Sequence, residues 1–237
     1  MLKIENLTKK YGDKSAIDNL NLEVQDGEIF GFIGHNGAGK TTTIKCMVGI
    51  LEFDNGNIYI NGNSIKDEPL KCKKDIAYIP DNPDIYENLT GISYLNFVAD
   101  IFEIDKKTRE ERINKYAEAF EIKNELQDLI SSYSHGMKQK LVIISALIHT
   151  PKLLILDEPF VGLDPKASFT LKEIMKEMTK EGAAIFFSSH VLEVVEKLCD
   201  KVGIIKEGKL ITYGTVEEVK GNESLEEVFL ELIKDEK

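Results

Sequence analysis

A glycine-rich segment near the N-terminus has the residue types and spacing of a phosphate-binding loop. Gly34 is followed after four residues by Gly39, Lys40 and Thr41. Glycines let a backbone curl so that successive N–H groups face one anion. Lys40 would reach the β- and γ-phosphates of a nucleotide, and the Thr41 hydroxyl would ligate Mg²⁺. The alternative is a flexible glycine-rich turn. The expected nucleotide-binding residues here are Gly34, His35, Asn36, Gly37, Ala38, Gly39, Lys40, Thr41 and Thr42.

Two adjacent carboxylates could turn phosphate binding into hydrolysis. Asp157 and Glu158 directly follow the apolar run 153–156, which has the composition of a buried strand. At the end of that strand, Asp157 would hold the Mg²⁺ shell and Glu158 would act as general base near the γ-phosphate. The alternative is an acidic loop after a buried strand, which the pairing with a phosphate-binding loop disfavours.

The elements that must position these residues alternate between strand and helix. Residues 29–33 form an apolar run that ends at Gly34, and residues 42–49 have the length and content of a helix. Strand, loop and helix therefore follow in the required order. A second short β-prone run at 184–187 follows a helical stretch, as expected for parallel strands joined by a crossover. Asn-Gly pairs on either side of 57–60 predict an antiparallel hairpin.

A helical insert interrupts this core. Ile113, Tyr116, Ala117 and Phe120 have the i, i+3, i+4, i+7 spacing of an amphipathic helix. The predicted fold is α/β: a P-loop NTPase core with a mostly parallel sheet, an N-terminal antiparallel β subdomain and an inserted α-helical subdomain. We expect a single domain over 1–237, with the core in 1–83 and 151–218 and the insert in 84–150. A Ser224–Glu227 capping box predicts a short C-terminal helical extension over 219–237.

The segment 133–139, Tyr-Ser-His-Gly-Met-Lys-Gln, indicates which family of phosphate-loop proteins the chain resembles. It resembles the signature of ATP-binding cassette (ABC) transporter subunits, usually Leu-Ser-Gly-Gly-Gln, and the resemblance covers essentially the whole chain. It implies that Ser134 and Gly136, at the N-terminus of a helix that begins near Lys138, bind the γ-phosphate held by an opposite subunit. A serine that merely caps a helix is the alternative. Only Ser134 and Gly136 match strictly, and this form resembles the branch that serves multidrug, antibiotic and ABC-2-type permeases.

Further positions carry roles implied by the same resemblance. Tyr11 resembles the aromatic residue that stacks on adenine, although a half-buried strand tyrosine is the alternative. Asp164, in Gly-Leu-Asp-Pro, resembles the loop that passes between two subunits, and an ordinary turn is its alternative. His190 resembles the histidine that contacts the γ-phosphate and the attacking water, and a structural histidine is the alternative. Asp81 stands where the family usually has a glutamine that touches Mg²⁺, and an exposed turn aspartate is the alternative.

Composition limits the partners. The net charge of −11 argues against nucleic acid, since there is no basic track. The cysteines Cys46, Cys72 and Cys199 are widely spaced, as expected for reduced cytosolic thiols. No apolar run reaches the ~18 residues of a membrane span. We therefore expect a cytoplasmic protein, and the resemblance implies a peripheral position on the inner face of the cell membrane.

The resemblance implies a function and its partners. The expected function is an ATP-binding and ATP-hydrolysing subunit that powers a membrane transporter through ATP-driven dimerisation, with export favoured. The cofactors would be ATP and Mg²⁺. The partners would be a separate permease chain and a second ATP-binding subunit, identical or closely related. The alternatives are a soluble ABC-type ATPase that acts on DNA or ribosomes and a regulator that binds ATP without turnover.

Overall fold

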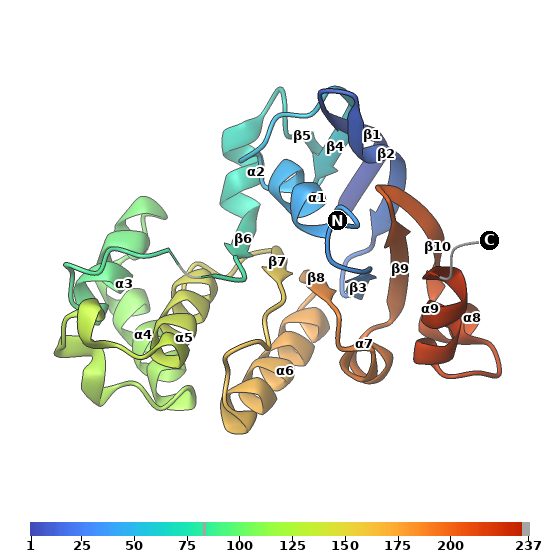
Figure 1. The fold of residues 1–237 in the computed structure, drawn as a ribbon. Coiled ribbons are helices and arrows are strands. Elements are labelled where there is room, and N and C mark those ends of the chain that lie inside the picture. Colours follow the sequence, from blue (N-terminus) through green and yellow to red (C-terminus); the bar gives the residue numbers. More distant parts are fainter. Residues whose placement is uncertain (83, 234–237) are drawn as a thin grey trace.

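The computed structural model describes residues 1–82 and 84–233 and is built on two sheets (Figure 1). The predicted domain boundary at residue 83 and residues 234–237 of the predicted extension lie outside this range. Within the described residues, no helix combines the length and the apolar character needed to cross a membrane.

The larger sheet has six strands in the order β10-β9-β3-β8-β7-β6. Its pairs are parallel except β9–β10, which is antiparallel. Its strands are β3 (Ile29–Ile33), β6 (Ile76–Ile79), β7 (Leu153–Asp157), β8 (Ala184–Ser189), β9 (Lys201–Lys206) and β10 (Lys209–Thr215). The predicted mostly parallel sheet is therefore confirmed.

The smaller sheet is antiparallel and has the order β2-β1-β4-β5. Its strands are β1 (Leu2–Tyr11), β2 (Lys14–Val24), β4 (Asn55–Ile60) and β5 (Asn63–Ser64). Asn61 and Gly62 join the last two strands with φ of 50° and 79°, as a tight hairpin turn requires. The predicted hairpin and antiparallel β part are therefore confirmed.

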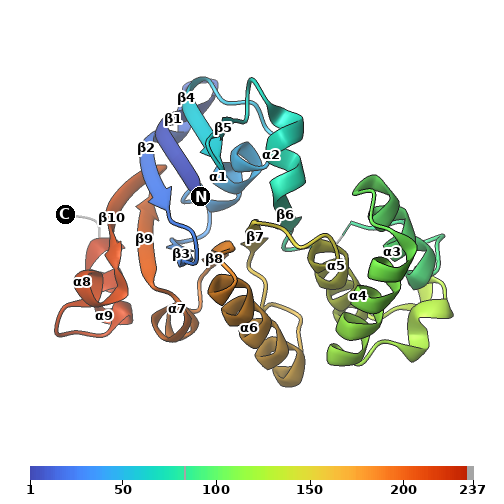
Figure 2. The same ribbon diagram turned by 180° about the vertical axis from the view of Figure 1, so that it is seen from behind.

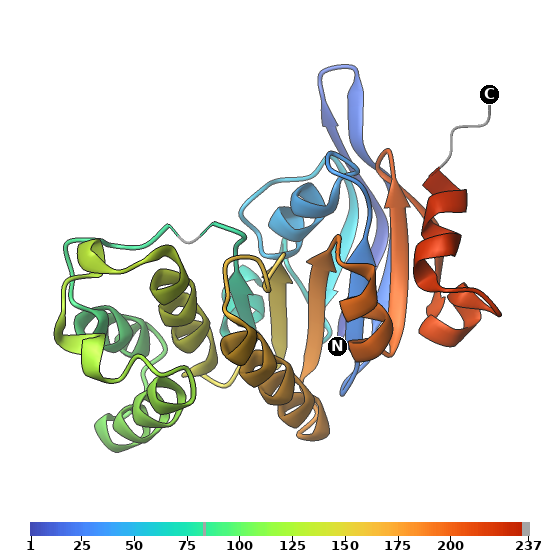
Figure 3. The same ribbon diagram turned by 60° about the horizontal axis from the view of Figure 1, so that its bottom comes forward.

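Both faces of the larger sheet are covered, which explains its continuous apolar strands. Phe30 and Phe32 point into a core shared with the antiparallel sheet and α1 (Lys40–Met47), whereas Ile29 and Ile33 point into the opposite core. Figure 3 shows the orange helices α6 (Pro165–Lys180) and α7 (Leu192–Leu198) against that opposite face. The loop between β3 and α1 is thus anchored at both ends in buried structure. The helix α1 begins at Lys40, two residues before its predicted start at residue 42.

The predicted helical insert is a separate lobe beside β6 and β7 (Figure 2). Ile113, Tyr116, Ala117 and Phe120 are buried, as their spacing predicted. The helix α5 begins at His135 rather than near Lys138, because Ser134 accepts the N–H of Met137 and so caps an earlier turn. The lobe contains α3 (Gly91–Ile101), α4 (Lys106–Ala119), α5 (His135–Leu147) and the 3₁₀ turns Asn124–Gln127 and Ile130–Ser132. Near β4 and β6 lies α2 (Pro69–Asp75).

Two short helices follow β10 at the opposite end of the molecule from the helical lobe (Figure 2). They are α8 (Val216–Lys220) and α9 (Leu225–Ile233). The Ser224–Glu227 capping box is present, since Ser224 N donates to Glu227 and Glu227 N donates to Ser224 Oγ. Leu225 is buried in the core. The predicted domain boundary at residue 218 falls inside α8.

Candidate functional site

Steric crowding and backbone conformation both account for the glycines of the loop after β3. A Cβ on Gly34 would lie 2.5 Å from the Ile205 carbonyl oxygen, and one on Gly39 would lie 2.6 Å from that of Ala16. Gly37 and Gly39 have φ of 82° and 113°, which side chains disfavour. The loop can therefore curl tightly only with these glycines, and the helix that follows gives it the positive end of a helix dipole.

Lys40 lies at the start of α1 and is 7% exposed. Its Nζ donates to the carbonyl oxygen of Gly34 at 2.6 Å and lies 3.8 Å from Glu158 Oε1. Burial lowers the pKa of the Lys40 ammonium, and the nearby Glu158 and Asp157 carboxylates oppose part of that shift. A cation held in a poorly solvated position beside a loop of N–H groups is suited to bind a polyanion.

The two carboxylates occupy the end of β7. Asp157 is 2% exposed, and the Ser188 hydroxyl on β8 donates to its Oδ1 at 2.5 Å. Glu158 has φ of 50°, a left-handed conformation that costs a non-glycine residue about 1–3 kcal/mol. Its backbone N–H donates to Ser188 Oγ at 3.1 Å. The strain identifies Glu158 as a residue whose placement outweighs local backbone preference.

His190 completes a chain of contacts through Glu158. His190 Nδ1 lies 2.9 Å from Glu158 Oε2, and the His190 backbone N–H donates to the same oxygen at 3.3 Å. Glu158 therefore stands between the Lys40 ammonium and the His190 ring. Sequence analysis expected each of these three residues near the γ-phosphate, and the fold brings Glu158 into contact with both Lys40 and His190.

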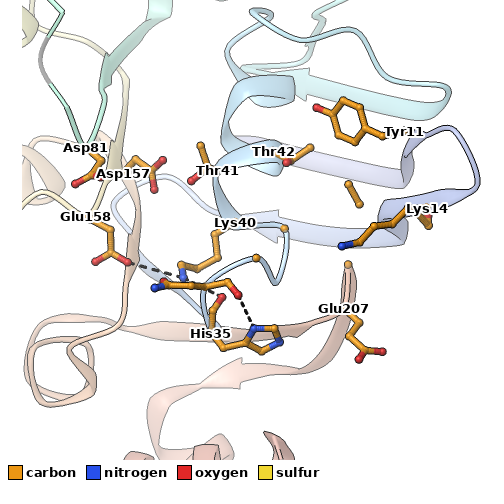
Figure 4. Close-up of a pocket in the computed structure, with 16 residues that line it drawn as sticks. Tyr11, Lys14, His35, Lys40, Thr41, Thr42, Asp81, Asp157, Glu158 and Glu207 are labelled. Atoms are coloured by element: carbon orange, nitrogen blue, oxygen red, sulfur yellow. Dashed lines mark hydrogen bonds and ion pairs between the residues drawn. The ribbon is translucent and has the colours of Figure 1, made fainter.

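A cavity of about 780 Å³ lies beside these side chains. Figure 4 shows Asp81, Asp157 and Glu158 on one side of Lys40, and Tyr11, Lys14 and Glu207 on the other. The predicted residues that line the cavity are Tyr11, His35, Asn36, Gly37, Gly39, Lys40, Thr41, Thr42, Asp81, Asp157 and Glu158. Gly34 does not line the cavity, but its carbonyl oxygen accepts a hydrogen bond from Lys40 Nζ. Ala38 is a buried residue of the loop.

Five further lining residues come from segments to which sequence reasoning gave no role: Lys14, Ser15, Ala16, Glu207 and Gly208. Gly208 N donates to Ala38 O, and Gly208 O accepts from Asp18 N. The β9–β10 turn is thus fixed between the loop and β2. A Glu-Gly pair between two apolar runs is typical of a hairpin turn, but only the fold shows that this hairpin borders the cavity.

Tyr11 is the last residue of β1 and is 54% exposed. Its ring lies on the wall of the cavity, with Lys9 Nζ 5.4 Å from the ring centroid. A large exposed ring at the mouth of a polar cavity is available for stacking on a flat aromatic ligand. An exposure of 54% at the end of β1 also fits the alternative, a half-buried strand tyrosine.

Ser134, Gly136 and Asp164 are outside the lining of this cavity. Ser134 caps α5, and a Cβ on Gly136 would lie 3.2 Å from Gly162 O. Asp164 caps α6 through the N–H of Ala167 at 2.8 Å and pairs with Lys140 of α5 at 2.7 Å. The hydrogen bond from Lys140 lowers the pKa of Asp164. These three residues therefore gather where α5 meets the loop after Glu158.

The oxygen donors in the cavity fit Mg²⁺. Thr41, Asp81 and Asp157 line the same space and lie near one another in Figure 4. A hydroxyl and one or two carboxylates, completed by water and phosphate oxygens, are a usual ligand set for Mg²⁺. Among the residues that the structure describes, there is no group of three or more His, Cys, Asp or Glu side chains that could hold a metal ion. That is compatible with a cation shared with a nucleotide rather than held by protein alone.

Comparison with known proteins gives consistent matches. The family model described as ABC transporter matches residues 17–161. The ABC-type transporter ATP-binding protein EcsA of Bacillus subtilis (strain 168) is 34% identical over 241 residues, covering 100% of this chain and 98% of EcsA. The bacitracin transport ATP-binding protein BcrA of Bacillus licheniformis is 41% identical over 212 residues, covering 89% of this chain and 68% of BcrA. A solved structure of an ATP-binding subunit of an ABC transporter superposes with a TM-score of 0.95 at 35% identity, covering 99% of this chain and 100% of that one.

Proposed function

This chain belongs to the ABC transporter family and is an ATP-binding subunit, an ATPase that drives transport, and from that premise we propose how its residues do so. Two such chains bind two Mg·ATP molecules between them, and the closure and reopening of the pair move a separate permease. The observation that carries this proposal is the division of the site. One cavity holds a complete phosphate loop and acidic pair, while Ser134 and Gly136 lie outside it.

Nucleotide binding falls to the cavity. The N–H groups of the loop 34–42 and the Lys40 ammonium receive the phosphates. Tyr11 stacks on adenine at the open end of the cavity, where its ring is exposed. Thr41 and Asp157 would hold Mg²⁺, and so would Asp81, which lines the same cavity. When bound, Mg²⁺ would neutralise phosphate charge that develops during hydrolysis.

Hydrolysis falls to Glu158 and His190. Glu158 lines the cavity and takes a proton from the attacking water as general base. His190, at 2.9 Å from Glu158 Oε2, orients that carboxylate and contacts the γ-phosphate and the attacking water. The Lys40–Glu158 contact at 3.8 Å must loosen when phosphate takes the ammonium. Nucleotide binding would thus release Glu158 for catalysis.

The N-terminus of α5 supplies the second half of each site. Ser134 and the backbone at Gly136 face a γ-phosphate held by the other chain, with the helix dipole adding attraction. Asp164 lies at the same junction and contacts the partner near the two nucleotides. In a two-fold pair each chain gives its loop to one site and its α5 terminus to the other site.

The permease is a separate membrane chain, and this subunit works at the inner face of the cell membrane. Export is the direction that the form of the 133–139 motif favours, and BcrA, named for bacitracin transport, is among the similar proteins. The alternative function, a soluble ABC-type ATPase that acts on DNA or ribosomes, has no such support. We divide the chain into a core, 1–83 with 151–218, the insert 84–150 and the extension 219–237.

The mass of a Glu158→Gln variant in solution tests the two-chain site. Without its general base this variant binds ATP but hydrolyses it about 10²–10⁴-fold more slowly, so a closed pair should accumulate. Light scattering after size exclusion should show monomer without nucleotide and dimer with Mg·ATP. Lys40→Ala in the same background is the control and should stay monomeric. A Glu158→Gln variant that binds ATP and stays strictly monomeric would contradict the proposal.

A further inference from the structure

One buried hydroxyl connects both carboxylates of the site. Ser188 is 0% exposed on β8, where it pairs in register with Asp157 on the parallel strand β7. Residues in register on neighbouring strands point to the same face, so the Ser188 side chain meets that of Asp157. Its Oγ lies 2.5 Å from Asp157 Oδ1 and 3.1 Å from the Glu158 backbone nitrogen.

The direction of these two hydrogen bonds is fixed by chemistry. An ionised carboxylate can only accept, and a backbone N–H can only donate. The single Ser188 proton must therefore go to Asp157 Oδ1, while a lone pair on Oγ accepts from Glu158. The hydroxyl has no proton left for a third partner. Each contact thus constrains the other, and the chain runs from Glu158 N–H through Ser188 to Asp157.

From this geometry we propose that Ser188 is the positioning residue of the catalytic centre. With Oδ1 engaged by Ser188, Asp157 presents Oδ2 to a cation in the cavity. With its N–H engaged, Glu158 keeps the left-handed backbone, φ 50°, that directs its carboxylate toward Lys40 and His190. Ser188 itself touches neither nucleotide nor cation.

The surroundings of Ser188 support this role. The other residues of β8 up to Phe187 are apolar and buried, and a polar side chain in such a strand is costly unless it is hydrogen-bonded. Asp157 is only 2% exposed, so the bond between them is charge-assisted and poorly screened. Neighbours of this kind orient metal ligands, and their removal typically weakens metal affinity by about 10–100-fold.

The inference rests on the proposed Mg²⁺ role of Asp157, and nucleotide binding with and without Mg²⁺ tests it. The full chain is titrated with a non-hydrolysable ATP analogue in chelator and at increasing Mg²⁺. For Ser188→Ala we expect unchanged affinity in chelator and roughly ten-fold more Mg²⁺ for half-maximal enhancement. Ser188→Thr, which keeps the hydroxyl, should restore the requirement of the unmodified protein. Ser145→Ala is the control, because that buried hydroxyl, which donates to Val142 O and also contacts the Tyr94 side chain, is not among the residues that line the cavity.

Ser188→Cys keeps the proposal testable should the alanine variant not fold, because a thiol is a weak donor of similar shape. It should show the same increase in Mg²⁺ requirement. A normal Mg²⁺ requirement in either folded variant would overturn the role of Ser188, as would an equal loss of affinity with and without Mg²⁺. If the unmodified protein showed no Mg²⁺ enhancement, the proposed metal site would fail instead, and the two failures are therefore distinct.

Discussion

At the scale of single residues, the site combines groups that are unfavourable in the folded chain without ligand. Lys40 is buried with a lowered pKa, and Glu158 has a left-handed backbone. Both features reduce the stability of the nucleotide-free protein, and both are typical of residues that are arranged for binding and catalysis. A bound polyphosphate would give the buried Lys40 ammonium an anionic partner in place of the water that burial excludes.

Replacement of this lysine should separate stability from binding. Lys40→Met should raise the free energy of unfolding at neutral pH, because it removes an ammonium whose burial lowers its pKa. In the window between that lowered pKa and the ordinary lysine pKa, the unfolded chain binds more protons than the folded one, so the stability of the unmodified protein rises with pH. The advantage of the variant should therefore be full at neutral pH and shrink toward pH 10. ATP affinity should fall by roughly 10–100-fold, for a lost charged hydrogen bond of ~1.5–3 kcal/mol.

Urea denaturation at several pH values, with calorimetric ATP titration, measures both effects. Lys176→Met is the control, since that side chain is half exposed and should change neither quantity noticeably. A Lys40→Met protein that is less stable at neutral pH than the unmodified one would contradict the electrostatic explanation.

At the scale of elements, α5 links the helical lobe to the core through its C-terminus. His149 follows this helix, its ring stacks on Phe102 at 3.8 Å, and its Nε2 lies 3.1 Å from Ile76 O at the start of β6. Burial lowers the pKa of His149, and the nearby Arg112 cation acts in the same direction. The neutral ring is therefore the form that fits this junction, with Nε2–H donating to the carbonyl oxygen.

This junction should make stability depend on pH. Below the ordinary histidine pKa the unfolded chain takes up a proton that His149 resists in the fold, so stability is full above about pH 6.5 and falls as the pH drops toward 5. His149→Phe should lose about 1 kcal/mol at pH 7.5 with the hydrogen bond to Ile76, and the difference should narrow on acidification. Chemical denaturation from pH 5 to 7.5 measures this. A difference in stability between His149→Phe and the unmodified protein that stays constant from pH 5 to 7.5 would argue against it.

Elements were more predictable from sequence than their junctions. The buried strands before Gly34 and Asp157, the Asn-Gly hairpin and the apolar stripe of α4 each follow from local patterns, and the structure has all of them. The start of α5 was predicted three residues late, because the strength of the Ser134 cap was underestimated. The roles of Ser188 and of the β9–β10 turn depend on strand order and register, which one sequence does not reveal.

At the scale of the whole molecule, the two sets of proposed nucleotide-binding residues lie on different parts of the chain. The phosphate loop and acidic pair lie on the core, whereas Ser134 and Gly136 lie on the helical lobe, at the contact with the loop that carries Asp164. A chain built this way has one complete cavity and one helix terminus without a phosphate of its own. That separation is the physical reason for expecting a second chain.

The most direct test is complementation between two inactive variants. Lys40→Ala removes the phosphate-binding ammonium, and Ser134→Asp keeps a good helix cap but places a negative charge where the partner's γ-phosphate would bind. Each variant alone should release almost no phosphate from ATP. In a mixed pair, one site has an intact loop from one chain and an intact α5 terminus from the other. An equimolar mixture should therefore recover about one quarter of the unmodified rate if the sites act independently. A mixture no more active than the two variants measured separately would contradict the two-chain site.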